Sequence, residues 1–455
     1  MTKRSLTGLV ALSLCSASCE RGLEEPPPVP TVAVERADPP WTDAWIVAEA
    51  ERYLGDVAFR RSMLEQSLTN HDNLYSRTRL SAYGRADGSG WEALPAWIPH
   101  ATPVTAAIAQ RFVEGELEAI VVEPIWDGAG PRTMDEWIAL GRRVFFEYPL
   151  RPEIFAEHAL ARRGVALESG MAPAADGSWP GLVVFADVDR AMRVGITCAF
   201  CHTAIESGTV VAGRARRELD YGALRLAYHR DTGAPLQDEL ARRMATWGPG
   251  RADITEDEDQ DPVAIPDLWG IRHQSALTAA GTIQHVHPAA LAIRQETQIL
   301  HANRERTRPP RELAWALAMY VYALEPPVSA AAPDDARMVR GARLFDKHCR
   351  RCHGNPVLGG APVRAETVGT DPALAHSTAR GTGSYRPPSL LGVRDAAPYL
   401  HHAVVPTLED LLSPARFEAD YDRGARGAGP IMGHPFGADL PPDDRAALVA
   451  WLRTQ

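Results

Sequence analysis

Two stretches of the chain place apolar residues at the spacing of an amphipathic helix. The first covers residues 311–324 and the second residues 443–453, and in both the apolar positions recur at i, i+3 and i+4. These positions are Leu313, Leu317, Tyr320 and Leu324 in the first stretch, and Ala447, Leu448, Trp451 and Leu452 in the second. A third stretch, residues 48–68, has the same helical periodicity. The pattern therefore predicts a mainly α-helical protein.

Each of the first two predicted helices is the last element of a longer sequence pattern that occurs twice in the chain. Each copy has a Gly-x-x-x-Phe element, a Cys-x-x-Cys-His element, a Pro-x-Leu-x-Gly-x-Arg element and then the helix. The first copy lies at residues 141–145, 198–202, 266–272 and 311–324, and the second at residues 341–345, 349–353, 388–394 and 443–453. Four elements in one order are a rare coincidence, so we expect two related units that differ mainly in the length of their loops.

Every cysteine after position 19 belongs to one of the two Cys-x-x-Cys-His elements. This spacing puts two thiols on one helical turn, where they reach the two vinyl groups of a haem, and puts the next histidine under the iron. The predicted attachment residues are Cys198, Cys201, Cys349 and Cys352, and the predicted proximal ligands are His202 and His353. The motifs thus predict two covalently bound haem c groups.

Three other uses of Cys-x-x-Cys fit the sequence less well. A zinc site needs four ligands, so each pair would need a second pair nearby. A thioredoxin-like redox pair does not require the histidine that follows both motifs. A disulfide within such a short element is strained.

Length and charge limit the other function classes. The chain has 455 residues, enough for two to four domains, and 45% of them are hydrophobic and 23% charged, as in globular proteins. Its formal net charge of −10 argues against nucleic acid as a partner. We expect the partner to be an electron donor or acceptor protein instead.

The N-terminus reads as an export signal. Lys3 and Arg4 precede a short apolar run, and small residues then lead to Cys19, as in a bacterial lipoprotein signal. Plain secretion and a retained anchor are the alternatives. We therefore expect a periplasmic or cell-envelope protein that touches the membrane only through a lipid anchor. The expected organisation is a signal at 1–19, a proline-rich tether at 20–41, a first haem domain with an N-terminal elaboration at 42–327, and a second haem domain at 328–455.

An acidic run at residues 256–261 allows two interpretations. Clustered carboxylates are the ligands that calcium prefers. The alternative is a solvated loop.

The arrangement resembles the di-haem cytochrome c peroxidase superfamily, which includes bacterial cytochrome c peroxidases, the di-haem enzyme that matures methylamine dehydrogenase, and the rubber oxygenases. The matching segments are Leu-Gly-Arg-Arg-Val-Phe-Phe at 140–146, Gly-Ile-Thr-Cys at 195–198, Pro-Pro-Ser-Leu at 387–390, Ala-Pro-Tyr-Leu-His at 397–401 and Thr-Leu-Glu-Asp at 407–410. The resemblance covers residues 134–455. It implies a mainly α fold of two cytochrome c-like domains with long loops and an N-terminal helical elaboration.

The resemblance also implies that the two haems have different roles. The first haem would react with a small-molecule oxidant, and the second would relay electrons to it. Gln295 and Glu296 lie in the region of the peroxidase catalytic residues. The chain departs from the family at His401-His402-Ala403, where His-Asp-Gly is usual, and lacks the usual Trp-Asp-Gly between the haems, for which Trp269 is a candidate replacement.

The distal ligands decide the chemistry of each haem, because an iron with an open sixth position can bind oxygen or peroxide. For the second haem the candidates are His434, which we favour, and Met432, both in a loop before the last helix. For the first haem they are His285 and His287, whose alternative role is to line a pocket. Together with the resemblance, these residues imply a peroxidase-type oxidoreductase, with pure electron transfer or an oxygenase of the rubber-oxygenase type as alternatives.

Overall fold

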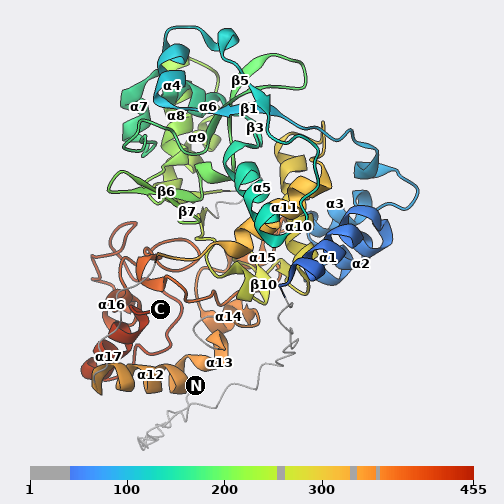
Figure 1. Ribbon diagram of the computed structural model, residues 1–455. Helices are drawn as coiled ribbons and strands as arrows, with labels where there is room; N and C mark the ends of the chain where they lie inside the picture. Colours follow the sequence, from blue (N-terminus) through green and yellow to red (C-terminus); the bar gives the residue numbers. More distant parts are fainter. Residues whose placement is uncertain (1–40, 254–261, 328–335, 355–358) are drawn as a thin grey trace, which may run out of the picture. The chain divides into compact units, whose positions relative to one another are not determined.

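The computed structural model describes residues 41–253, 262–327, 336–354 and 359–455, and these parts of the chain are mainly helical (Figure 1). The predicted signal and most of the tether, and the acidic run, lie outside the described residues. The first three helices are α1 (Asp43–Gly55), α2 (Val57–Ser67) and α3 (Leu74–Ala82).

The periodic stretch at residues 48–68 forms parts of two helices rather than one. Asp56 interrupts it with an extended backbone, φ −102° and ψ 100°. Its side chain accepts a hydrogen bond from the backbone N–H of Phe59 at 2.9 Å and so caps the start of α2. A single aspartate therefore changes the direction of a run whose apolar pattern is continuous.

A five-stranded antiparallel sheet occupies part of the region expected to be loops. Its order is β2-β1-β4-β5-β3. The strands are β1 (His100–Pro103), β2 (Glu123–Pro124), β3 (Arg151–Pro152), β4 (Leu182–Ala186) and β5 (Met192–Ile196). The sequence of β4 is apolar throughout, which periodicity cannot distinguish from a buried helix. The end of β5 leads directly into the first Cys-x-x-Cys-His element.

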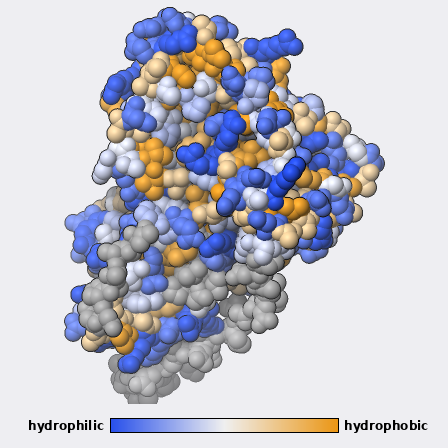
Figure 2. Space-filling view, in the orientation of Figure 1, coloured by the Kyte–Doolittle hydropathy of each residue, from blue (hydrophilic) through white to orange (hydrophobic). Residues whose placement is uncertain are grey.

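Five helices accompany this sheet; apolar side chains of the first four share a core with it, and the fifth packs on the fourth. They are α4 (Ala106–Val113), α6 (Ile154–Ala161), α7 (Arg163–Glu168), α8 (Tyr221–Thr232) and α9 (Asp238–Trp247). No residue of α4 is buried, and the side chain of Val113 is 58% exposed. Figure 2 shows hydrophobic residues gathered on this part of the surface.

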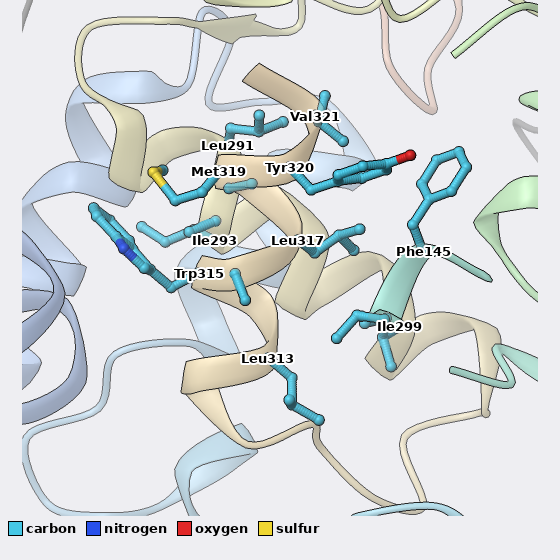
Figure 3. Close-up of a cluster of buried hydrophobic side chains, with 14 of the residues drawn as sticks. Phe145, Leu291, Ile293, Ile299, Leu313, Trp315, Leu317, Met319, Tyr320 and Val321 are labelled. Carbon is cyan, nitrogen blue, oxygen red and sulfur yellow. The ribbon is translucent and has the colours of Figure 1, made fainter. Parts of the chain in front are cut away.

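Helices α5 (Met134–Glu147) and α11 (Arg311–Ala323) cross at a glycine, and α10 (Pro288–Ala302) packs beside α11. A Cβ added at Gly141 would stand 1.9 Å from the carbonyl oxygen of Ala316, so only glycine permits this approach. One turn further on, the rings of Phe145 and Tyr320 lie 5.2 Å apart (Figure 3). The predicted helix at residues 311–324 is confirmed.

Helices α12 (Ala336–His348) and α17 (Pro442–Leu452) repeat the same crossing. A Cβ at Gly341 would stand 2.4 Å from the carbonyl oxygen of Ala447. The rings of Phe345 and Trp451 lie 4.7 Å apart. The helix predicted at residues 443–453 is confirmed, and the glycine and the aromatic pair occupy matching positions in the two copies.

The third recurring element also has one conformation in both copies. Gly270 and Gly392 have φ of +69° and +70°, and each begins a short 3₁₀ helix, η4 (Ile271–His273) and η5 (Val393–Asp395). Non-glycine residues rarely adopt this conformation. The two elements contact each other: a Cβ at Gly270 would meet Leu391 at 3.1 Å, and one at Gly392 would meet Trp269 at 2.8 Å.

The remaining elements are short. They are α13 (Arg350–His353), α14 (Ala365–Val368), α15 (Ala373–His376), α16 (Leu408–Leu411), β6 (Thr203–Glu206), β7 (Thr209–Ala212), β8 (Arg251–Ala252), β9 (Val263–Ala264), β10 (Ala276–Leu277), β11 (Ile283–Gln284), β12 (Val363–Arg364) and β13 (Ser384–Tyr385), with 3₁₀ turns η1 (Gly90–Ala93), η2 (Leu117–Ala119), η3 (Cys198–Phe200) and η6 (Pro414–Phe417). No helix within the described ranges combines the length and apolar character that a membrane span requires.

Candidate haem centres

The second Cys-x-x-Cys-His element forms one helical turn at the end of α12. The backbone N–H groups of Cys352 and His353 both donate to the carbonyl of Cys349, at 3.1 and 3.0 Å. This turn brings both thiols and the imidazole to one end of the helix. The Gly341 crossing fixes α12 against α17, so the packing of two helices positions the element.

The imidazole of His353 is oriented by a backbone carbonyl. Its Nδ1 donates to the carbonyl oxygen of Pro388 at 3.3 Å, which leaves Nε2 for another partner. Metal-binding histidines are usually held in this way. Burial lowers the pKa of His353, so the ring is neutral near pH 7, as a metal ligand must be.

His434 lies opposite His353. The two ring centres are 6.4 Å apart. Two imidazole nitrogens each about 2 Å from one metal, with each ring centre about 1.1 Å behind its nitrogen, would put the ring centres about 6 Å apart. The spacing therefore leaves room for one metal ion that both imidazoles would bind. By contrast, the side chain of Met432 is 58% exposed.

The loop that carries His434 is held by a buried arginine. The guanidinium of Arg416 donates to three backbone carbonyls of this loop, those of Ile431, Gly433 and His434, at 2.6 to 2.8 Å. The backbone N–H of His434 donates to the carbonyl of Val368 at 2.7 Å. The histidine is thus kept in place by its backbone.

The side chain of His434 is well suited to a metal. Burial, and next the neighbouring His353 and Arg416, lowers the pKa of His434 to about 4. Its buried Nδ1 has no hydrogen-bond partner among the described residues. A neutral imidazole with an unsatisfied buried nitrogen fits the group that the sequence predicts at this site.

The first Cys-x-x-Cys-His element repeats the orientation of the proximal histidine. The N–H of His202 donates to the carbonyl of Cys198 at 3.2 Å, and its Nδ1 donates to the carbonyl of Pro266 at 3.0 Å. Pro266 and Pro388 occupy the same position in the two copies of the third element. Burial lowers the pKa of His202 to about 4, so this ring is also neutral.

The four cysteines are present as thiols without disulfide bonds. Burial raises the pKa of Cys198 to about 12 and that of both Cys201 and Cys349 to about 11, and it also raises the pKa of Cys352. Catalytic redox cysteines have lowered pKa values instead. No group of three or more metal-binding side chains converges anywhere in the described ranges, a geometry that the zinc interpretation would need.

The two histidines suggested for the distal side of the first haem have other partners. Nδ1 of His285 donates to the carbonyl of Gln274 at 3.0 Å, and its Nε2 accepts from the hydroxyl of Tyr322. His287 caps α10 by accepting from the N–H of Ala289, and its Nε2 lies 3.2 Å from a carboxylate oxygen of Glu49. The imidazoles of His285 and His287 therefore both interact with residues outside the first Cys-x-x-Cys-His element.

Glu296, one of the two suggested catalytic residues, lies in a buried polar cluster. Its Oε2 accepts hydrogen bonds of 2.7 Å from the hydroxyls of Tyr53 and Tyr83, and Arg311 lies 3.4 Å from its Oε1. Burial, and next the charge of Glu296, raises the pKa of both tyrosines well above the usual value. Gln295 accepts a hydrogen bond from its neighbour Arg294 at 3.1 Å.

Arg294 was not predicted as a site residue, yet its charge reaches the first element. Its charge partly offsets the rise that burial causes in the pKa of Cys198, and it adds to the lowering that burial causes in the pKa of His202. No motif marks this arginine, because it comes from α10, far away in sequence.

His401 and His402 form an aromatic stack with Tyr385, with ring centres 4.3 Å apart at each step. They line a cavity of about 240 Å³, together with Arg251 and Asp371 among others. Burial lowers the pKa of His401 to about 3 and that of His402 to about 4. Both rings are therefore neutral at pH 7.

Comparison with known proteins identifies the second unit. The model of the cytochrome c family matches residues 338–455. No curated protein matches the chain. Residues 338–455 thus form a cytochrome c domain, which implies a covalently bound haem c and a role in electron transfer.

Proposed function

We propose that the protein carries two haem c groups, one in the cytochrome c domain and one at Cys198, Cys201 and His202, and that it passes electrons between them. The observation that carries the proposal is the repeated orientation of the proximal histidines by Pro266 and Pro388. A chance Cys-x-x-Cys-His sequence would not also reproduce that hydrogen bond, the glycine helix crossing and the αL glycine turn.

At the second centre, the thiols of Cys349 and Cys352 would attach the group, and His353 and His434 would bind its iron. A haem iron with two imidazole ligands exchanges single electrons without binding a substrate. Imidazole in place of a thioether lowers the reduction potential, because methionine favours the reduced iron. His434 therefore suits a domain that delivers electrons.

Trp269 is the residue that we assign to the connection between the two units. Its indole is 2% exposed, its Nε1 donates to the carbonyl of Ala212 at 3.2 Å, and its ring contacts Gly392 of the other unit. Trp269 and Gly392 belong to the two elements whose prolines hold the proximal histidines. The proposed electron-transfer route between the two proximal histidines thus runs through short covalent segments of these two elements and crosses the one packed contact between Trp269 and Gly392.

We further propose that the first centre reacts with a small-molecule oxidant such as a peroxide. The supporting observation is that His285 and His287, the histidines suggested as its distal ligands, have other partners. Arg294 is then available to orient or stabilise an anionic group near His202. Electron transfer alone, with two six-coordinate irons, is the competing function.

Two measurements test these proposals. The mass of the intact purified protein should correspond to two attached haems, and the paired variants C198S/C201S and C349S/C352S should each lose one. Carbon monoxide should change the spectrum of the reduced wild-type protein and of C349S/C352S. If the wild-type protein binds neither carbon monoxide nor cyanide in any redox state, the proposal of a reactive first centre is wrong. A mass that corresponds to two attached haems would still support the electron-transfer proposal.

A further inference from the structure

The region around the second Cys-x-x-Cys-His element is basic in a chain whose net charge is −10. All six lysine and arginine side chains of residues 336–353 are exposed, whereas this segment has a single acidic residue, Asp346. The basic residues are Arg337, Arg340, Arg343, Lys347, Arg350 and Arg351. Positive charge is therefore concentrated on the surface next to the attachment site.

The helix geometry separates a packed face from a basic face. Gly341 and Phe345 are buried against α17. Val339, Arg343 and Lys347 are four residues apart, so they lie in one row on the opposite side of α12. The side chain of Val339 is 45% exposed within this row.

Helix stability does not account for this row. Like charges four residues apart destabilise a helix by about 0.2–0.5 kcal/mol. The favourable effect of cations at a helix C-terminus applies to Lys347 in the last turn of α12, but not to Arg340 or Arg343. Arg343, Lys347 and Arg351 form no ion pair with another described residue, while Arg340 lies 2.5 Å from Asp444.

We propose that the basic face of α12, continued by Arg350 and Arg351, is the docking surface for an acidic electron-transfer protein. The inference rests on the proposed function, because it assigns a partner to the cytochrome c domain. Arg350 and Arg351 lie between Cys349 and Cys352, so a protein bound here would approach the attached haem closely. Opposite charge would steer the encounter and raise its rate.

An anionic membrane surface is the other acidic partner that this face could meet. A helix that lies on a membrane needs a broad apolar face in addition to its cations. The apolar side of α12 is already packed on α17, and Val339 is the single large apolar residue of the exposed row. The geometry therefore favours a protein partner over lipid.

The test uses the haem-loaded protein and a reduced flavodoxin, a small acidic redox protein, as the probe. Stopped-flow absorbance would give the second-order rate constant for reduction over a range of ionic strength. The charge-reversed variant carries Arg343→Glu and Lys347→Glu. The matched control carries Arg132→Glu and Arg163→Glu, two exposed arginines of the other unit.

At low ionic strength the Arg343→Glu/Lys347→Glu variant should react at least about tenfold more slowly than wild type, and the control within about twofold of it. The wild-type rate should fall with added salt, and that of the variant should not, because the Debye length shortens to about 8 Å at 0.15 M. Equal rates and salt dependences for wild type and variant would overturn the docking proposal.

Two control measurements distinguish a failure of the docking proposal from a failure of the proposed function. A photoreduced, uncharged deazaflavin should reduce wild type and variant at the same rate, which would show an intact redox centre. If it reduces neither, the proposed function itself fails. If the variant loses binding to phosphatidylglycerol vesicles but keeps the wild-type rate with flavodoxin, the surface contacts lipid and the proposal is wrong.

Discussion

Gly392 packs directly on the indole of Trp269. A Cβ at position 392 would stand 2.8 Å from Cε3 of that ring, and the glycine has φ +70°. The equivalent Gly270 packs on Leu391, the residue that corresponds to Trp269 in the other copy. The two copies of this element therefore contact each other reciprocally, with the glycine of each copy packed on the residue that precedes the glycine in the other.

This contact should make Gly392→Ala more damaging than an ordinary glycine substitution. The left-handed backbone costs about 1–2 kcal/mol for alanine, and the clash with Trp269 should add about 1–3 kcal/mol. Gly383→Ala is the matched control, because Gly383 has φ +74° and open space around it. Urea unfolding would measure both; equal losses would mean that the contact tolerates a methyl group.

Gly141→Ala should destabilise the first unit by about 2–3 kcal/mol or more, because the methyl group would overlap the backbone of Ala316. Gly164→Ala, in the helix α7 with open space around it, should instead stabilise by about 0.5–1 kcal/mol. Thermal unfolding of the two variants would show the opposite signs. A neutral Gly141→Ala would show that α5 and α11 can move apart freely.

With haem attached at Cys349 and Cys352, His434→Ala should convert a low-spin iron to one that binds added ligands, because it would remove one of the two imidazoles proposed to bind that iron. Met432→Ala should leave the spectrum unchanged, since that side chain is 58% exposed. Visible and electron paramagnetic resonance spectra of the oxidised variants would test both. A spectrum altered only by Met432→Ala would exchange the two assignments.

Stability should fall as the pH drops from about 6.5 toward 4. In the unfolded chain a histidine has a pKa of about 6.5. In the folded protein burial lowers the pKa of His401 to about 3 and of His402 to about 4. Between these values the unfolded state binds more protons, so acid favours unfolding, by about 3 kcal/mol for His402 alone.

The double variant His401→Gln/His402→Gln should flatten this dependence without removing it, because other buried histidines also titrate. Denaturant unfolding at several pH values between 4 and 7 would show the change in slope. An unchanged slope would mean that the two rings gain protons in the folded protein as easily as in the unfolded chain.

Glu296 should prove important for stability rather than for turnover. Glu296→Ala would leave Arg311 without one of its buried partners and two tyrosine hydroxyls without an acceptor, at a cost of about 3–5 kcal/mol. Glu296→Gln keeps an acceptor and should lose less. Peroxide reduction per mole of folded, haem-loaded protein should match wild type in Glu296→Gln; a large fall there would restore the catalytic assignment.

The local elements followed from the sequence because each depends on nearby residues. The helices at residues 311–324 and 443–453 could be predicted from the spacing of their apolar residues. The helical turn of the Cys-x-x-Cys-His element could be predicted from the spacing of its cysteines and histidine. The sheet was missed because its strands are short and β4 is apolar throughout. Asp56, which divides the helical stretch at 48–68, acts through a cap that periodicity does not record.

By itself the sequence showed the repeat, in which four elements occur twice, and predicted the covalent chemistry, namely which thiols and histidines could hold haem. Only the tertiary structure decided how these pieces meet. It placed His434 rather than Met432 across from His353, engaged His285 and His287 with other partners, and brought Trp269 against Gly392. Those outcomes depend on packing between segments far apart in the chain, and such distances are set by the whole core rather than by any local pattern.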